Sequence, residues 1–294
     1  MVGYVFKRYE LKYILDSAQY AAIKAEIEKR LSPDEFGRNT VQSLYYDTPD
    51  NRLIRASMEK PAFKEKLRVR CYNLNNDDKN VYVEMKRKYD GVVYKRRIAC
   101  KEGEVTALIK GEKQNDGDNE IATACSPCVT SRTRTDKPQI GGRTPTDKPQ
   151  AGGRTPTSQI GKELDYFTRF YGNLTPKILI LCEREAFCDK ESDLRVTFDE
   201  NIRYRADDLN FYSSLDGENL LPDDCVLMEL KSGSAFPLWL CRILGEQNVK
   251  KQSFSKYGSA YERELLKSKL RSNIICLNRF SATATSPQSV SLSS

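Results

Sequence analysis

The stretch YVEMKRKYDGVVYKRR, residues 82–97, constrains the fold of this chain more than any other. Apolar and polar residues alternate from 81 to 88, which is the period of a β-strand. Asp90 and Gly91 follow, and this pair is typical of a two-residue hairpin loop because both central positions of such a turn require positive φ. The stretch therefore predicts two antiparallel strands, near residues 80–88 and 92–100.

The register of this hairpin places cations on the same face of neighbouring strands. Counting outward from the loop predicts that Lys86 faces Lys95 and that Glu84 faces Arg97. Like charges directly opposite each other destabilise an antiparallel pair. Either salt screens the repulsion on a solvated face, or a polyanion lies on that face.

Other segments repeat the alternation of charged and apolar residues, so that one side of each predicted strand carries Lys or Arg with an occasional carboxylate. The segments are FKRYELKYIL (6–15), KEKLRVRCY (64–72), LILCEREAF (179–187), SDLRVTFDE (192–200) and LMELKS (227–232). A sheet of such strands has either a large solvated basic face or the form of a barrel with the charges inside. Closure into a barrel also removes exposed sheet edges.

A basic lumen is costly unless anions or water fill it. Phosphate oxygens suit it, because Arg binds them through two hydrogen bonds and Lys as a point charge. The few carboxylates fit a divalent metal that bridges phosphates, which is commonly held by one or two carboxylates.

The charge distribution agrees with an anionic partner. The chain has 294 residues and a formal charge of +7, and the window from Lys60 to Lys101 alone contains 13 basic and 5 acidic residues. Such a local basic field points to phosphate chains, nucleic acid or a lipid surface. The chain has no histidine, which excludes histidine general bases and phosphohistidine intermediates.

The cysteines and the apolar runs indicate a cytoplasmic protein. The nine cysteines are scattered, and the start MVGYVFKRYE lacks the apolar core of a signal peptide. Reduced thiols are the simplest interpretation. No apolar run approaches the roughly 20 residues that span a bilayer, so no transmembrane segment is expected.

The chain divides into two ordered parts. Residues 132–157 repeat with a period of 11 (RTRTDKPQIGG, RTPTDKPQAGG, RTPT) and have almost no apolar content. We therefore expect a disordered insertion at 114–158, between a first domain part at 1–113 and a second at 159–270. A low-complexity tail is expected at 271–294.

The ordered parts read as a sheet-rich α+β protein built of hairpins rather than of βαβ units. Asp16 or Ser17 is expected to cap the first helix. Strands are expected near 4–14, 41–46, 63–72, 80–88, 92–100, 176–188, 193–199 and 226–232. Helices are expected from the cap to about residue 31, just after residue 49, and near 159–173, 236–248 and 254–269.

In this order, the segments RYELKY, SLYYDTPDN, KLRVRCY, VYVEMKRK, YKRR, CEREAF, LRVTFDENIRY, MELKS and SFSKY resemble the VTC domain. This is the polyphosphate polymerase domain of the vacuolar transporter chaperone family, within the triphosphate tunnel (CYTH-like) superfamily. The resemblance covers about residues 4–110 and 159–262. It implies an antiparallel β tunnel barrel with flanking helices and a C-terminal helical element.

The resemblance also implies an activity: transfer of the terminal phosphate of ATP to a growing polyphosphate chain, with Mn²⁺ or Mg²⁺ as cofactor. Matched by position to the residues of that family, the catalytic cations of this chain would be Arg68, Arg70, Lys86 and Arg184. The phosphate-binding residues are Lys12, Lys95, Arg195, Ser255 and Lys256. Glu229 is the metal ligand. For Ser255 and Lys256 there is also a reason that does not depend on the resemblance: a helix N-terminus with a Ser cap and an adjacent Lys favours phosphate binding.

The sequence is compatible with three classes of function. The first is the polymerase, the second is a tunnel hydrolase of triphosphate or polyphosphate, and the third is a non-catalytic polyphosphate-binding module. Hydrolases of the superfamily often begin with Glu-x-Glu-x-Lys, whereas this chain has Arg8-Tyr-Glu10-Leu-Lys12, which favours the polymerase. An interleaved aromatic platform for RNA is absent from the sequence, so no nucleic-acid partner is expected. Glu10 and Glu84 either neutralise neighbouring cations or bind metal.

Overall fold

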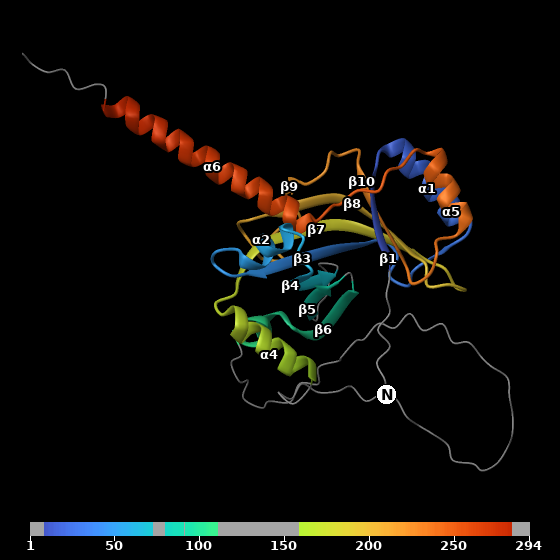
Figure 1. Cartoon of the computed structure of the whole chain (residues 1–294), viewed down its shortest axis with the longest axis horizontal. Coiled ribbons are helices and arrows are strands. Elements are labelled where there is room, and N and C mark those ends of the chain that lie inside the picture. The colour runs from blue at the N-terminus through green and yellow to red at the C-terminus, as the bar shows by residue number, and fades with distance from the viewer. Residues whose placement is uncertain (1–8, 73–79, 91, 111–158, 284–294) are drawn as a thin grey trace, which may run out of the picture.

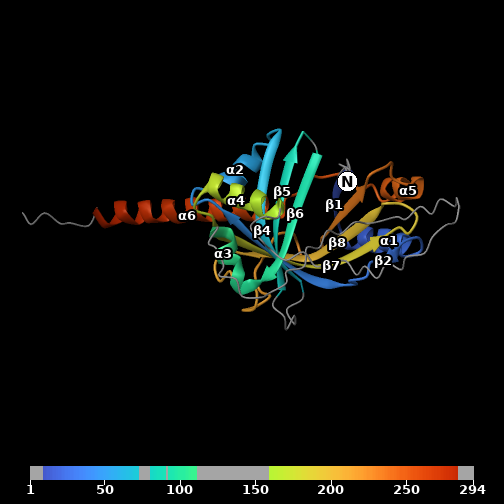
Figure 2. The same ribbon diagram turned by 90° about the horizontal axis from the view of Figure 1, so that it is seen from below.

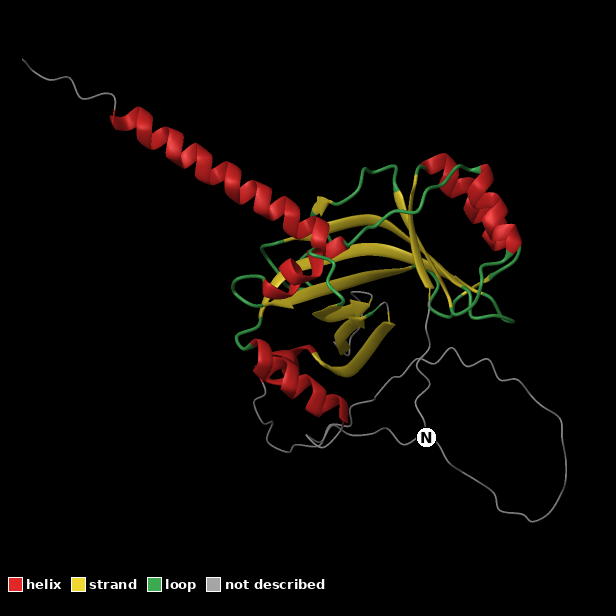
Figure 3. Ribbon diagram, in the orientation of Figure 1, coloured by secondary structure: helices red, strands yellow, loops and turns green. Residues whose placement is uncertain are grey.

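The computed structural model describes residues 9–72, 80–90, 92–110 and 159–283. Its core is one antiparallel sheet of ten strands (Figure 3). The strands are β1 (Tyr9–Leu15), β2 (Ser32–Pro33), β3 (Asn39–Asp47), β4 (Phe63–Tyr72), β5 (Asn80–Tyr89), β6 (Val92–Lys101), β7 (Thr175–Cys188), β8 (Arg195–Arg205), β9 (Glu218–Asn219) and β10 (Val226–Ser232). The helices are α1 (Ser17–Glu28), α2 (Arg52–Met58), α3 (Val105–Lys110), α4 (Gln159–Tyr171), α5 (Leu238–Glu246) and α6 (Lys256–Thr283), with a 3₁₀ turn at Glu102–Glu104. The expected insertion at 114–158 lies outside the described residues.

The strand order is β1-β10-β8-β7-β3-β4-β5-β6, with β2 paired to β7 and β9 to β8. The sheet bends sharply, so that β4, β5 and β6 stand at an angle to β7 and β8 (Figure 2). Within the described residues, the edge strands β1 and β6 share no backbone pairing. Side chains bridge the gap instead, because Lys86 Nζ on β5 lies 3.7 Å from Glu10 Oε2 on β1. The expected antiparallel α+β tunnel fold is thus confirmed, but backbone hydrogen bonds do not close the barrel.

The hairpin register is confirmed. Lys86 pairs with Lys95 and Glu84 pairs with Arg97. Asp90 has a φ of 44°, as the expected turn requires. The first helix also begins as expected, since the Asp16 carboxylate accepts the backbone N–H of Gln19 at 2.9 Å in a capping box.

Two apolar clusters lie on the outer, convex face of the sheet, beneath pairs of helices. One packs β4, β5 and β6 against α3 and α4, with Leu67, Val83 and Leu164 almost fully buried. The other packs β1, β8 and β10 against α1 and α5. These helices leave the inner, concave face of the sheet free for charged side chains. The short elements α3, β2 and β9 were not among those predicted from the sequence.

A third cluster lies on the concave face and fills one end of it. Tyr257, at the start of α6, stacks on Tyr45 of β3 with ring centroids 4.5 Å apart. Its hydroxyl donates to Asp47 Oδ2 at 3.0 Å, and Asp47 also accepts the backbone N–H groups of Leu53 and Ile54 in α2. One buried carboxylate thus fixes both α2 and the base of α6.

The rest of α6 projects from the body of the molecule (Figure 1). The helix runs to Thr283, beyond residue 270, where the second domain part was expected to end. None of the helices in the described residues is long and apolar enough to cross a membrane.

Candidate phosphate-binding site

Two facing walls of the concave face, defined below by their residues, together hold ten cations and four carboxylates. The hairpin wall comprises the inward residues of β4, β5 and β6: Lys66, Arg68, Arg70, Glu84, Lys86, Lys95 and Arg97. The carboxylate wall comprises the inward residues of β1, β10, β8 and β7 together with Lys256 of α6: Glu10, Lys12, Arg184, Asp199, Glu229, Lys231 and Lys256. Strand alternation explains both sets, because every second residue of a strand points to the same face.

Glu84 is the centre of the hairpin wall and is 1% exposed. Its Oε1 lies 2.8 Å from Lys95 Nζ and 2.5 Å from Arg97 Nη2, and its Oε2 lies 2.7 Å from Arg68 Nη2. Burial would raise the pKa of Glu84, but Arg68, Arg70, Lys95 and Arg97 outweigh it and hold the pKa well below its usual range. Glu84 therefore stays ionised and holds cations of the two neighbouring strands, β4 and β6, in fixed positions.

Arg70 is held differently from Arg68. Its Nε donates to Ser43 Oγ at 3.3 Å and its Nη1 donates to Tyr72 Oη at 3.2 Å, while Glu84 Oε2 lies 4.0 Å away. Only 8% of Arg70 is exposed. Neutral hydroxyls thus orient a buried guanidinium whose charge is only weakly compensated, as an anion-binding group requires.

Two lysines of the hairpin wall have strongly lowered pKa values. Burial lowers the pKa of Lys95 to about 7, with Arg68 and Arg97 adding to the effect and Glu84 opposing it. Burial and the neighbouring Lys86 and Lys12 lower the pKa of Lys66 to about 8. Burial also lowers the pKa of Lys86. An anion placed between these side chains would restore their charge.

The N-terminus of α6 meets the hairpin wall at Ser255. Lys66 Nζ donates to Ser255 Oγ at 3.1 Å, and the same oxygen accepts the backbone N–H of Gly258 at 3.2 Å. Ser255 therefore caps α6 as Ser residues commonly do. The helix N-terminus, Lys66 and Ser255 form a group of donors that suits a phosphate oxygen.

The carboxylate wall pairs its cations more completely. Arg184 donates to both oxygens of Asp199, at 2.5 and 2.6 Å, and Lys256 also contacts Asp199. Asp199 is fully buried. Burial would raise its pKa, but Arg184 and Lys256 outweigh it and lower the pKa. The predicted catalytic Arg184 and the predicted Lys256 therefore share one carboxylate, which sequence analysis did not identify as their partner.

Glu229 lies between two lysines of the same wall. Its oxygens are 3.1 Å from Lys12 Nζ and 3.0 Å from Lys231 Nζ, and burial is outweighed by these cations, so its pKa is lowered. Lys12 also donates to the carbonyl oxygen of Phe254 at 3.1 Å. Among the described residues, no group of three or more His, Cys, Asp or Glu side chains could hold a metal ion. An ionised Glu229 fits a metal that takes its other ligands from phosphate oxygens and water.

Arg195 stands apart from the other predicted residues. Its guanidinium donates to Asp34 Oδ2 at 2.6 Å and lies 3.7 Å from Cys188 Sγ. Register places Arg195 opposite Lys231, on the concave face, but at the first residue of β8. It therefore lies at the edge of the site with a carboxylate partner already in place.

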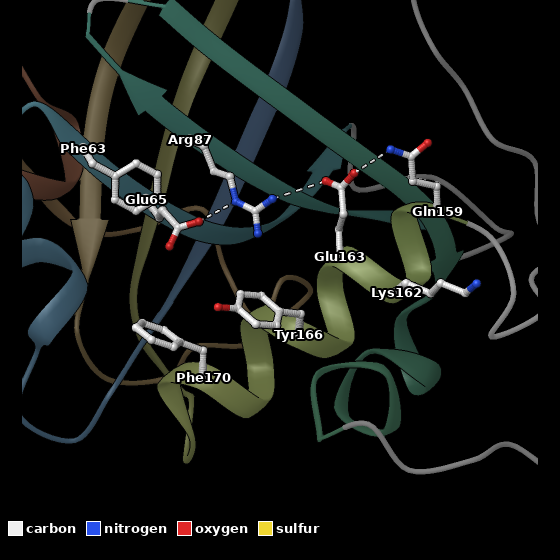
Figure 4. Close-up of a pocket in the computed structure, with 8 residues that line it drawn as sticks. All are labelled: Phe63, Glu65, Arg87, Gln159, Lys162, Glu163, Tyr166 and Phe170. Carbon is white, nitrogen blue, oxygen red and sulfur yellow. Dashed lines mark hydrogen bonds and ion pairs between the residues drawn. The ribbon is translucent and has the colours of Figure 1, made fainter.

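The convex face offers a contrast. Between α4 and the hairpin strands lies a recess of about 540 Å³ lined by Phe63, Glu65, Arg87, Gln159, Lys162, Glu163, Tyr166 and Phe170 (Figure 4). Arg87 bridges Glu65 and Glu163, and Arg96 lies 3.1 Å from Glu163. Arg87 and Arg96 thus share two carboxylates, whereas the three arginines of the hairpin wall have only Glu84.

Three further residues of the site, Lys66, Arg97 and Asp199, are not among those predicted from the sequence. Lys66 lies two residues before Arg68, so strand alternation alone could have found it. Asp199 shares the inward face of β8 with Thr197, but nothing in the local sequence shows that Arg184 and Lys256 are its partners.

The comparisons with known proteins agree with this arrangement. The model of the family described as the VTC domain matches residues 7–264. No curated protein matches the chain.

Several solved structures are similar in outline. A candidate adenylyl cyclase from Hippeastrum, with a dominant triphosphatase activity, is 14% identical, has a TM-score of 0.45, and is matched over 84% of this chain and 92% of that chain. A candidate adenylate cyclase from Bacillus halodurans is 9% identical, with a TM-score of 0.43 over 84% of this chain and 92% of that one. One from Vibrio parahaemolyticus is 10% identical, with a TM-score of 0.40 over 86% and 97%.

Proposed function

Since this chain belongs to the VTC domain family, we propose that it is a polyphosphate polymerase that transfers the terminal phosphate of ATP to a growing chain of inorganic polyphosphate. The observation that carries the proposal is the hairpin wall, where six cations face one carboxylate. A wall with this excess of buried positive charge is suited to a polyanion.

In this proposal Arg68, Arg70, Lys86 and Arg184 contact the transferred phosphoryl group. Phosphoryl transfer depends mainly on positioning and on neutralising charge on the equatorial oxygens. Arg70 is suited to this role because hydroxyls orient it and leave its charge weakly compensated. Arg184 would share its guanidinium between Asp199 and the phosphoryl oxygens.

The remaining predicted residues hold the phosphate chain on either side of the reacting group. Lys95 lies beside Glu84 and Lys12 beside Glu229, and Ser255 and Lys256 lie at the N-terminus of α6. Arg195, at the edge, binds phosphate only when it leaves Asp34.

The reaction forms a bond between a terminal oxygen of the acceptor chain and the γ-phosphorus of ATP, and it breaks the bond between that phosphorus and the β–γ bridging oxygen. ADP leaves with the bridging oxygen. The attacking oxygen is already anionic near neutral pH, so the step needs no general base, which agrees with a chain that lacks histidine. Glu229 would hold Mn²⁺ or Mg²⁺, which when bound neutralises charge on phosphate oxygens.

The test is to incubate the purified protein with ATP and Mn²⁺ and to resolve the products on a polyphosphate gel beside a free-phosphate assay. We expect a ladder of growing chains with stoichiometric ADP. Free phosphate without a ladder would instead establish a hydrolase, and tight polyphosphate binding without turnover would establish a binding module. An Arg70→Ala protein purified in parallel controls for contaminating kinases.

A further inference from the structure

A row of lysines continues from the concave face along β4 and β5. Lys66 pairs with Lys86, and the next pair on the same face is Lys64 with Lys88. Because a strand rises about 3.3 Å per residue, the second pair lies about 7 Å beyond the first. Lys60, between α2 and β4, is close enough to Lys64 to lower its pKa.

These outer lysines lack the carboxylates that accompany the inner cations. Lys86 lies near Glu10, and Lys95 near Glu84. By contrast, no carboxylate among the described residues forms an ion pair with Lys60, Lys64 or Lys88.

Charge repulsion along the row is therefore uncompensated. Two lysines directly opposite each other in an antiparallel pair are destabilising, and Lys64 and Lys88 occupy such a pair. Burial lowers the pKa of Lys64, and the charges of Lys88 and Lys60 lower it further. Lys64 is partly buried and Lys88 is exposed, and a bound anion would compensate the charge of both.

We propose that Lys60, Lys64 and Lys88, here called the outer lysines, bind the part of a long phosphate chain that extends beyond the concave face. The inference rests on the proposed function in one respect, which is that a phosphate chain occupies the concave face. Continuity of the row carries it, because a linear chain held by Lys66 and Lys86 reaches the next pair on the same two strands. Lysine suits this role, since a point charge on a flexible stem binds successive phosphates in any orientation.

The test compares ligands of two lengths on the full chain. Tripolyphosphate is short enough to be held by the cations of the concave face alone, whereas a polyphosphate of about a hundred phosphate units also reaches the outer lysines. The test variant is Lys64→Gln/Lys88→Gln. The matched control is Lys177→Gln/Lys190→Gln, which removes the same charge elsewhere, from a partly buried and an exposed lysine. Lys177 Nζ donates to the carbonyl oxygen of Pro49.

We expect the Kd of the test variant for long polyphosphate to rise about three- to tenfold, since exposed ion pairs contribute modestly. Its Kd for tripolyphosphate should stay within about twofold of the wild type, and the control variant should match the wild type for both ligands. The dependence of long-chain affinity on salt concentration should also become shallower, because fewer counterions are released.

Equal weakening for both ligands would overturn the inference, because it would show a general loss of positive field. Unchanged long-chain affinity would overturn it as well, and so would an equal loss when single-stranded RNA replaces polyphosphate. A wild-type protein that binds neither phosphate ligand overturns the proposed function itself. The two failures are therefore distinct, because the outer lysines can fail while the wild type still binds tripolyphosphate.

Discussion

The two walls of the concave face differ in how far carboxylates neutralise their cations. The hairpin wall sets six cations against Glu84, whereas the carboxylate wall sets four cations against Glu10, Asp199 and Glu229. The first wall keeps a large excess of positive charge, and the second nearly neutralises itself. A site that must bind a polyanion and also a divalent cation needs both kinds of surface, because one wall attracts phosphate and the other supplies an ionised carboxylate.

Removing a cation from the hairpin wall should have the largest effect. Arg70→Ala should lower kcat about a hundred- to a thousandfold if Arg70 contacts the transferred group, which is the cost of losing one oxyanion-hole donor. Single-turnover kinetics with ATP and a short polyphosphate primer would measure it. Arg96→Ala is the matched control, because Arg96 lies on the same hairpin but pairs with Glu163 on the convex face. Near-normal turnover in Arg70→Ala would remove Arg70 from the catalytic set.

Neutralising the single carboxylate of that wall should destabilise the unliganded protein. Glu84→Gln leaves Arg68, Arg97 and Lys95 without their anion, and we expect a loss near the lower end of about 3–5 kcal/mol, because Lys95 is partly exposed. Tripolyphosphate should then stabilise the variant more than it stabilises the wild type, since it supplies the missing charge. Urea denaturation with and without tripolyphosphate measures both. Equal stabilisation of the two proteins would show that the ligand does not approach these cations.

The corresponding change in the carboxylate wall should act on metal dependence. Glu229→Gln should raise the Mn²⁺ concentration for half-maximal activity about ten- to a hundredfold, a range that even supporting residues of metal sites reach. Glu185→Gln is the control, because Glu185 pairs with Lys24 on the convex face. An unchanged metal titration would mean that Glu229 serves only to neutralise Lys12 and Lys231.

The smallest effect expected is on the pH dependence of binding. A bound phosphate chain favours the charged forms of Lys95 and Lys66, whose pKa values burial lowers to about 7 and about 8. Binding should therefore take up protons, and affinity for long polyphosphate should fall about three- to tenfold between about pH 7.5 and 9. Calorimetry in two buffers of different ionisation enthalpy measures the uptake, and proton release would contradict the assignment.

The same pKa values determine whether the free energy of unfolding rises or falls with pH. Both lie below the value of 10.5 of an ordinary lysine, so between about pH 7 and 10.5 the unfolded chain binds more protons than the folded one. The free energy of unfolding of the unliganded protein should consequently rise with pH across this window. As pH increases, deprotonation of Lys66 and Lys95 should therefore weaken phosphate binding and stabilise the unliganded protein.

Much of the hairpin wall could be read from the sequence. Its register depends only on a turn and on strand alternation, both of which are local, and this is why the pairing of Lys86 with Lys95 was predicted correctly. The carboxylate wall could not be read in the same way. Asp199 contacts Arg184 on the preceding strand, through a register that a bulge in β7 shifts, and it contacts Lys256 at the start of α6. Neither contact follows from a local pattern.

The strand order itself was beyond local reasoning. Strand β3 lies between β4 and β7, so two segments far apart in the sequence are neighbours in the sheet. Arg195 shows the same limit, since its partner Asp34 follows the two-residue strand β2, which has too few residues to show any periodicity. The length of α6 was also underestimated, because polar residues interrupt its apolar pattern.

The contact between Lys86 and Glu10 has a mechanical consequence. In a closed barrel, strand number and stagger set the diameter. Here the edge strand β1 contacts β5 through one partly exposed ion pair, at 3.7 Å, and such pairs contribute about 0–1 kcal/mol. Breaking this one ion pair therefore costs little, so the gap between β1 and β5 can widen to admit a ligand, while the start of α6 holds the two walls together elsewhere through Lys66 and Asp199.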